Sequence, residues 1–232
     1  MPHPSSPFAA MLALCLGAAP ALAQDEAGDA PQSMLILDGS GSMWGQIEGT
    51  AKIEIAREAI DRMLADWPQD RDIGLMAYGH RSEGDCGDIE VLAEPGPLDR
   101  DAFNRSAAGI TPQGKTPIGA AVELAADELS SADRPATIIL VTDGRETCQA
   151  DLCTLGATLE ESGTGFTAHV IGFDVEDESG QLACLAEETG GRFIPASDSE
   201  TLTRALETAR EEAPAPLEPA AVEEFDGAAL GE

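Results

Sequence analysis

The feature that most constrains this chain is an apolar run that ends abruptly in acidic, hydroxyl and glycine residues. Met34 to Leu37 are apolar without alternation, which is typical of a strand buried on both faces of a parallel sheet. The next residues are Asp38-Gly-Ser40-Gly-Ser42. The glycines allow a sharp turn, and the polar residues place hard oxygens on one side of it. This pattern predicts a divalent-cation site, although a polar strand-to-helix loop with a helix cap gives the same letters.

Strand-like apolar runs alternate with amphipathic segments along the rest of the chain. We expect strands at 33–37, 72–78, 89–93, 136–142, 166–173 and 192–195. We expect helices at 51–66, 100–108, 118–129, 152–159, 182–186 and 202–209. Pro95 is expected to end the third strand, and Ser197-x-x-Glu200 predicts a capping box for the last helix. The alternation predicts an α/β fold with a doubly wound, mostly parallel six-stranded sheet, one antiparallel edge strand, and helices on both faces.

Two later stretches add oxygen ligands to the first motif. Lys115-Thr116-Pro117 opens a helical segment, and Asp143-Gly144 closes the apolar run 137–142. Together with Asp38-Gly-Ser40-Gly-Ser42, these pieces resemble the metal-ion-dependent adhesion site (MIDAS) of the von Willebrand factor type A (VWA) family. The resemblance covers roughly residues 32–212 and implies the strand order 3-2-1-4-5-6. In such sheets ligands bind beyond the carboxyl ends of the strands, where the strand order reverses.

The resemblance also implies a role for each of these residues. Ser40 and Ser42 would bind the metal through their hydroxyls, and Thr116 would bind it directly in a ligand-engaged state. Asp38 and Asp143 would act directly or through water. The cation would be Mg²⁺, or else Mn²⁺ or Ca²⁺, and it would keep residual positive charge that attracts an acidic side chain of a partner protein. The resemblance therefore implies a metal-dependent protein-binding module and not an enzyme.

The charge of the chain argues against two classes of partner. Its 13 Lys and Arg residues face 43 Asp and Glu residues, which gives a formal net charge of −30 at pH 7. Nucleic-acid binding needs a cationic face, and so does docking on anionic lipid. The balance argues against both and is compatible with cation binding.

The amino-terminal residues predict export. Phe8 to Ala23 is an apolar, small-residue run that ends in an A-x-A cleavage pattern, although no Lys or Arg precedes it. We expect a periplasmic or secreted protein of a bacterial envelope, with no membrane insertion after cleavage. The expected parts are a signal peptide at 1–23, a disordered lead-in at 24–31, the VWA domain at 32–212 and a disordered acidic tail at 213–232.

Four cysteines remain after removal of the signal peptide: Cys86, Cys148, Cys153 and Cys184. An even number in an exported protein predicts two disulfides, and the spacing leaves all three pairings open. Free thiols are the alternative in a reducing compartment, and a four-thiolate zinc site lacks the C-x-x-C spacing. We expect all four to lie in loops or helix starts on the face that carries the metal loop.

The segment Gly109–Thr116 supports a rival function, because it fits the phosphate-loop pattern G-x-x-x-x-G-K-T of ATPases. Its context disagrees with that function. Helix-like residues 103–108 precede it in place of a buried strand, and Pro112 lacks an N–H in a loop that must donate N–H groups.

A metal-assisted hydrolase is a third possibility. Ser40, Asp143 and either His80 or His169 could be drawn as a triad. The sequence has no G-x-S-x-G elbow, and metal-assisted hydrolysis usually uses stronger ligands than hydroxyls. His169 is expected within a strand and His80 in a loop near the metal face.

Overall fold

A six-stranded sheet forms the centre of the computed structural model, which describes residues 30–130, 134–161, 166–175 and 180–213. The signal peptide predicted at 1–23, and most of the segments predicted at 24–31 and 213–232, lie outside these residues. In sheet order the strands are β5 (Ile89–Gly96), β4 (Asp72–Tyr78), β1 (Gln32–Asp38), β6 (Ala136–Thr142), β7 (Phe166–Phe173) and β8 (Phe193–Ala196). Within this sheet only the β4–β5 pair is antiparallel. The predicted fold class, strand order and antiparallel edge are confirmed.

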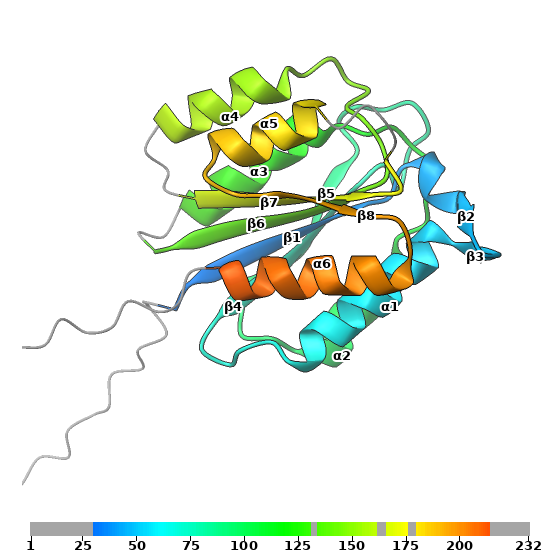
Figure 1. Ribbon diagram of the computed structural model, residues 1–232, viewed down its shortest axis with the longest axis horizontal. Helices are drawn as coiled ribbons and strands as arrows, with labels where there is room; N and C mark the ends of the chain where they lie inside the picture. The colour runs from blue at the N-terminus through cyan, green and yellow to red at the C-terminus, as the bar shows by residue number, and fades with distance from the viewer. Residues whose placement is uncertain (1–29, 131–133, 162–165, 176–179, 214–232) are drawn as a thin grey trace, which may run out of the picture.

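Helices cover both faces of the sheet (Figure 1). On one face lie α1 (Lys52–Ala65), α2 (Arg100–Gly109) and α6 (Ser199–Glu212), and on the other lie α3 (Ile118–Ser130), α4 (Leu152–Glu161) and α5 (Gly180–Glu188). Each layer of helices closes its own apolar core against the sheet. Within the described ranges, none of these helices combines the length and the apolar character that crossing a bilayer requires.

Strand β1 contributes to both cores, since all seven of its residues are buried. Leu35 and Leu37 pack in the core beneath α1 and α6. Met34 and Ile36 point the other way and pack in the core beneath α3 and α5. Side chains alternate between the faces of a strand, so a central strand covered on both faces must be apolar at every position. This requirement explains the unbroken apolar run.

The parallel strands end at a common level, which we call the carboxyl edge. Asp38 pairs with Tyr78 of β4, and Leu37 pairs with Val141 of β6, one residue before Thr142 ends that strand. The chain adds β4 and β5 on one side of β1, and β6, β7 and β8 on the other. The strand order therefore reverses between β1 and β6, where an open α/β sheet places its ligand site.

Short loops and turns cover the carboxyl edge. The 3₁₀ turn η1 (Gly41–Trp44) follows β1 and leads into a small hairpin, β2 (Gln46–Ile47) and β3 (Thr50–Ala51), which the sequence patterns did not predict (Figure 1). Gly79 holds two of the loops together, because its carbonyl accepts hydrogen bonds from Gln113 N (3.2 Å) and Gly114 N (2.7 Å). Its φ is +66°, and a Cβ there would clash with the Lys115 carbonyl, so only glycine fits.

Two local predictions were wrong for identifiable reasons. Strand β5 continues through Pro95 to Gly96, because it pairs only with β4 and an edge strand tolerates a residue without an N–H. The capping box of α6 is built from Asp198 and Thr201, and not from Ser197 and Glu200. Asp198 Oδ1 accepts from Thr201 N (2.8 Å), and Thr201 Oγ1 accepts from Asp198 N (3.0 Å).

Candidate metal site

Asp38 is the most buried ligand candidate, with no exposed surface at the end of β1. Its Oδ1 accepts from Ser40 N (2.7 Å), and its Oδ2 accepts from the Thr142 hydroxyl (2.7 Å). The buried Tyr78 hydroxyl donates in turn to Thr142 Oγ1 (3.1 Å). Burial, and then the charge of Asp143, raise the pKa of Asp38 from 3.8 to about 6. The strands therefore hold the Asp38 carboxylate in a fixed orientation, and its hydrogen bonds do not fully offset the cost of burying its charge.

Ser40 and Ser42 connect this carboxylate to the end of β6. Their hydroxyl oxygens are 2.9 Å apart, and Ser42 Oγ donates to Asp143 Oδ1 at 2.6 Å. Gly39 lets the first loop pass close to the end of β4, because a Cβ there would lie 2.7 Å from the Tyr78 carbonyl oxygen. Two loops that are about a hundred residues apart in sequence thus place their oxygens in one hydrogen-bonded chain.

Thr116 belongs to a third loop that lies against the first. Ser40 forms an isolated parallel bridge with Gly114, and Gly41 N donates to the Gly114 carbonyl (3.1 Å). Thr116 follows two residues later and is 5% exposed. Its backbone is fixed by Thr147, which accepts from Thr116 N at its hydroxyl (2.8 Å) and donates its own N–H to the Thr116 carbonyl (3.1 Å). All three predicted pieces therefore lie at the carboxyl edge.

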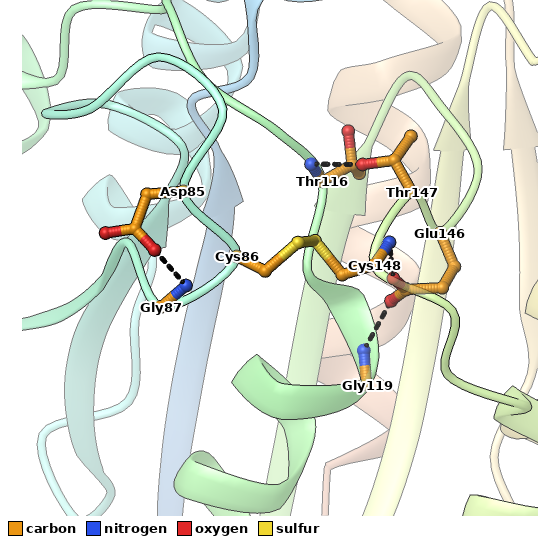
Figure 2. Close-up of a disulfide and its surroundings, with 8 residues drawn as sticks. All are labelled: Asp85, Cys86, Gly87, Thr116, Gly119, Glu146, Thr147 and Cys148. Atoms are coloured by element: carbon orange, nitrogen blue, oxygen red, sulfur yellow. Dashed lines mark hydrogen bonds between the residues drawn. A yellow bond between two sulfur atoms is a disulfide. The ribbon is translucent and has the colours of Figure 1, made fainter.

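A disulfide fastens the segment that holds this third loop. Cys148, the residue after Thr147, is bonded to Cys86 in the β4–β5 loop. Figure 2 shows this disulfide beside Thr147, which holds Thr116, and Glu146, which holds the start of α3. Glu146 Oε2 accepts from Gly119 N at 2.9 Å. The second disulfide joins Cys153 to Cys184. Cys184 lies in the middle of α5, so the expectation that all four cysteines occupy loops or helix starts is wrong for that residue.

The sequence patterns did not predict a positively charged side chain in the site, Lys52. Lys52 Nζ lies 3.2 Å from Asp143 Oδ2 and 2.9 Å from Asp174 Oδ2 at the end of β7. Burial works against the ammonium, but the hydrogen bonds to Asp174 and Asp143 raise the pKa of Lys52 above its usual value. A signal was present in the sequence. Lys52 is the only basic residue between 24 and 56, and it begins a helix, where the macrodipole disfavours a cation.

The donor set fits a hard divalent cation. Asp38, Ser40, Ser42 and Asp143 present carboxylate and hydroxyl oxygens, the ligands preferred by Mg²⁺, Mn²⁺ and Ca²⁺. No group of three or more His, Cys, Asp or Glu side chains in the described parts of the chain is arranged to hold a metal, and that includes this site, which has two carboxylates and depends on hydroxyl ligands. A bound cation would also offset the buried charge of Asp38, because buried charges without a counter-charge are costly and Lys52 contacts Asp143.

The geometry disfavours both rival functions. His80 Nε2 lies 3.1 Å from Glu90 Oε2, and His169 Nδ1 lies 3.8 Å from Glu212 Oε2, so both imidazoles face acids outside the site. Gly109 ends helix α2 and does not follow a strand, which is the wrong context for a phosphate loop.

Trp44 marks the rim of the site. It is the last residue of η1 and is 51% exposed, whereas its neighbour Met43 is fully buried. The indole N–H donates to the Pro112 carbonyl at 2.7 Å, which fixes the ring against the loop that carries Thr116. It is the one large apolar side chain that the described residues expose.

Comparisons with known proteins agree with this geometry. A family model described as the von Willebrand factor type A domain matches residues 33–146. Two proteins of Bacillus subtilis (strain 168), both described as uncharacterized, are similar over most of their length. YwmD is 28% identical over 200 residues, which cover 82% of this chain and 89% of YwmD. YwmC is 30% identical over 174 residues, which cover 70% of this chain and 75% of YwmC.

Solved structures share the fold at low sequence identity. The pilus adhesin SpaC from Lactobacillus rhamnosus GG has a TM-score of 0.64 at 13% identity, over 79% of this chain and 30% of SpaC. A von Willebrand factor type A protein from Catenulispora acidiphila has a TM-score of 0.63 at 22% identity, over 80% and 42%. Proximal thread matrix protein 1 from the mussel byssus, with a zinc-occupied MIDAS motif, has a TM-score of 0.61 at 16% identity, over 80% and 46%. This chain therefore spans less than half of each of these three proteins.

Proposed function

Because this chain belongs to the von Willebrand factor type A family, we propose that it is an exported protein-binding module whose bound divalent cation bridges to an acidic side chain of a partner. Ser40, Ser42 and Thr116 would hold the cation through hydroxyls, and Asp38 and Asp143 directly or through water. When bound, the cation supplies a positive centre that a carboxylate can coordinate. Adhesion and matrix proteins that share the fold, and one neighbour with a metal in its MIDAS motif, support the proposal.

The observation that carries the proposal is the hydrogen-bonded chain from Asp38 through Ser40 and Ser42 to Asp143. Its oxygens are already gathered, so binding a cation requires little rearrangement of the strands. Hydrogen bonds and a disulfide hold the loops around it. The remaining ligand of the cation would then be the partner's carboxylate. Export agrees with the two disulfides, which form and persist outside the cytoplasm.

Titration calorimetry of the mature protein with Mg²⁺ and Mn²⁺ tests the metal site. We expect one site per chain, and we expect Ser42→Ala to weaken binding at least about tenfold, because it removes a ligand and the hydroxyl that orients Asp143. Ser82→Ala is the matched control, since Ser82 donates to Asp88 through its backbone N–H, which the substitution keeps. Equal heats for wild type and Ser42→Ala would exclude the metal site.

Capture of envelope proteins on immobilised wild type, with and without chelator, tests the bridge. We expect bound proteins to be released by chelator and to be absent from beads that carry Ser42→Ala. Partners that remain bound in chelator and on both variants would show a plain protein surface in place of a cation bridge.

A further inference from the structure

A lysine occupies the position where the metal site meets the end of β7. The Lys52 side chain is about one-tenth exposed, and its ammonium contacts Asp143 and Asp174. Asp143 has a fully buried side chain, while that of Asp174 is 46% exposed. One ammonium is thus shared between a proposed metal ligand and an acid that has no place in the DxSxS–Thr–Asp pattern.

The main chain and the neighbouring turn fix the path of this lysine. Lys52 N donates to the Gly45 carbonyl (2.8 Å) at the end of η1. The aliphatic stem passes so close to Gly45 that a Cβ there would lie 3.2 Å from Lys52 Cε. The Lys52 stem therefore packs against the turn that carries Ser42, and its ammonium lies 3.2 Å from Asp143 Oδ2. A lysine at the start of a helix is unfavourable for the helix dipole. We therefore attribute its position to its contacts with Asp143 and Asp174.

We propose that Lys52 is a fixed counter-charge that sets how the site divides its affinity between the cation and the acidic ligand. The inference rests on the proposed function and adds a positioning residue to it. By neutralising part of Asp143, the ammonium weakens binding of the free cation. Through the same charge, it leaves the bound cation more attractive to an incoming carboxylate.

Charge balance supports this division of affinity. Asp38, Asp143 and Asp174 contribute three negative charges near the edge, and a divalent cation alone leaves one of them uncompensated. The Lys52 ammonium removes that excess, so an acidic side chain does not meet net negative charge at the metal. This matters here because the whole chain, with a formal net charge of −30, repels acids elsewhere.

In each of two variants, the affinity for Mn²⁺ and the affinity of the Mn²⁺-loaded protein for a carboxylate should change in opposite directions. For Lys52→Met, we expect Mn²⁺ to bind about tenfold or more tightly, and the carboxylate probe N-acetylglutamate α-amide to bind the Mn²⁺-loaded protein about tenfold more weakly. For Asp174→Asn, which leaves the ammonium less compensated, we expect Mn²⁺ to bind about threefold more weakly and the probe more tightly. Calorimetry measures Mn²⁺ binding, and broadening of the probe's proton resonances by Mn²⁺ measures probe binding.

Arg105→Met is the matched control, because it removes one positive charge from an exposed position on α2, at a residue that has no part in the metal motif. Circular dichroism melting of each variant confirms folding, and Asp174→Asn keeps the test valid if Lys52→Met does not fold. The inference is overturned if Lys52→Met binds Mn²⁺ and the probe with the same affinities as Arg105→Met, or if both of its affinities fall. Either result leaves the metal site itself intact. Failure of the wild type to bind Mn²⁺ overturns the proposed function as well.

Discussion

Asp38 combines full burial with a charge that the fold alone does not neutralise. Thr142 and Ser40 N donate to it, but burial and Asp143 still raise its pKa to about 6. In the metal-free protein the carboxyl group therefore prefers its proton more than it would in the unfolded chain. A group of this kind stabilises the fold below the unfolded pKa and loses that contribution as the pH rises through the folded value.

The pH dependence of the metal-free protein should show this sign. From below pH 3.8 to above pH 6, the raised pKa of Asp38 corresponds to a total loss of about 3 kcal/mol of stability, of which about 2 kcal/mol falls between pH 4.5 and pH 7.5. In chelator, Asp38→Asn should therefore gain stability relative to wild type by up to this amount on going from pH 4.5 to pH 7.5. Urea unfolding at the two pH values measures the difference. A constant difference between the variants would contradict the raised pKa.

Metal binding should reverse the advantage of the neutral side chain. At pH 7.5, saturating Mg²⁺ should stabilise wild type and leave Asp38→Asn nearly unchanged, because the cation binds the folded state with its carboxylates ionised.

At the scale of elements, two disulfides brace different parts of the molecule. Cys86–Cys148 joins loops at the carboxyl edge, next to the residues that hold Thr116. Cys153–Cys184 joins α4 to α5, which pack so closely that a Cβ at Gly156 would lie 2.9 Å from Glu188 Cβ. The first disulfide is thus coupled to the candidate site, and the second fastens a helix pair on the sheet's flank.

Removing either disulfide should lower stability by a similar amount, but removing one of them should also weaken metal binding. The loops span 62 and 31 residues in sequence, so chain entropy predicts losses of about 4 kcal/mol for both double Cys→Ser variants. We expect only Cys86→Ser/Cys148→Ser to weaken Mg²⁺ binding in addition, by several-fold, because Thr116 loses its anchor. Denaturant unfolding and calorimetry measure the two effects. Equal Mg²⁺ affinities in the two double variants would contradict a role for the edge disulfide.

The elements were predictable because their signals are local. The unbroken apolar run of β1 and the motifs that end β1 and β6 indicated both the sheet and its switch point. Lys52 and Asp174 were not predicted, because they approach Asp143 only through the packing of α1 against the sheet and the parallel pairing of β6 with β7. Disulfide pairing was left open for the same reason, since spacing along the chain does not encode distance between loops.

For the whole molecule, the dominant electrostatic fact is the formal net charge of −30. Self-repulsion of this size destabilises the compact state, and salt screens it. Specific and general effects of cations should therefore be separable.

Raising NaCl from about 10 mM to about 300 mM should increase the melting temperature of wild type and Ser42→Ala equally, because the Debye length falls below typical distances between surface charges. Mg²⁺ added at constant high ionic strength should raise it further only in wild type. Thermal melts at matched ionic strength measure both effects. An equal rise with Mg²⁺ in both proteins would assign the response to screening alone.

The placement of Trp44 has a practical consequence. The chain contains two tryptophans, and Trp67 is buried with its indole N–H bonded to the Arg71 carbonyl. The half-exposed Trp44 ring, fixed at the rim of the site, is therefore the indole whose emission responds to what covers that rim. The molecule carries its own fluorophore at the place where a ligand is proposed to dock, so association can be followed optically without attaching a label.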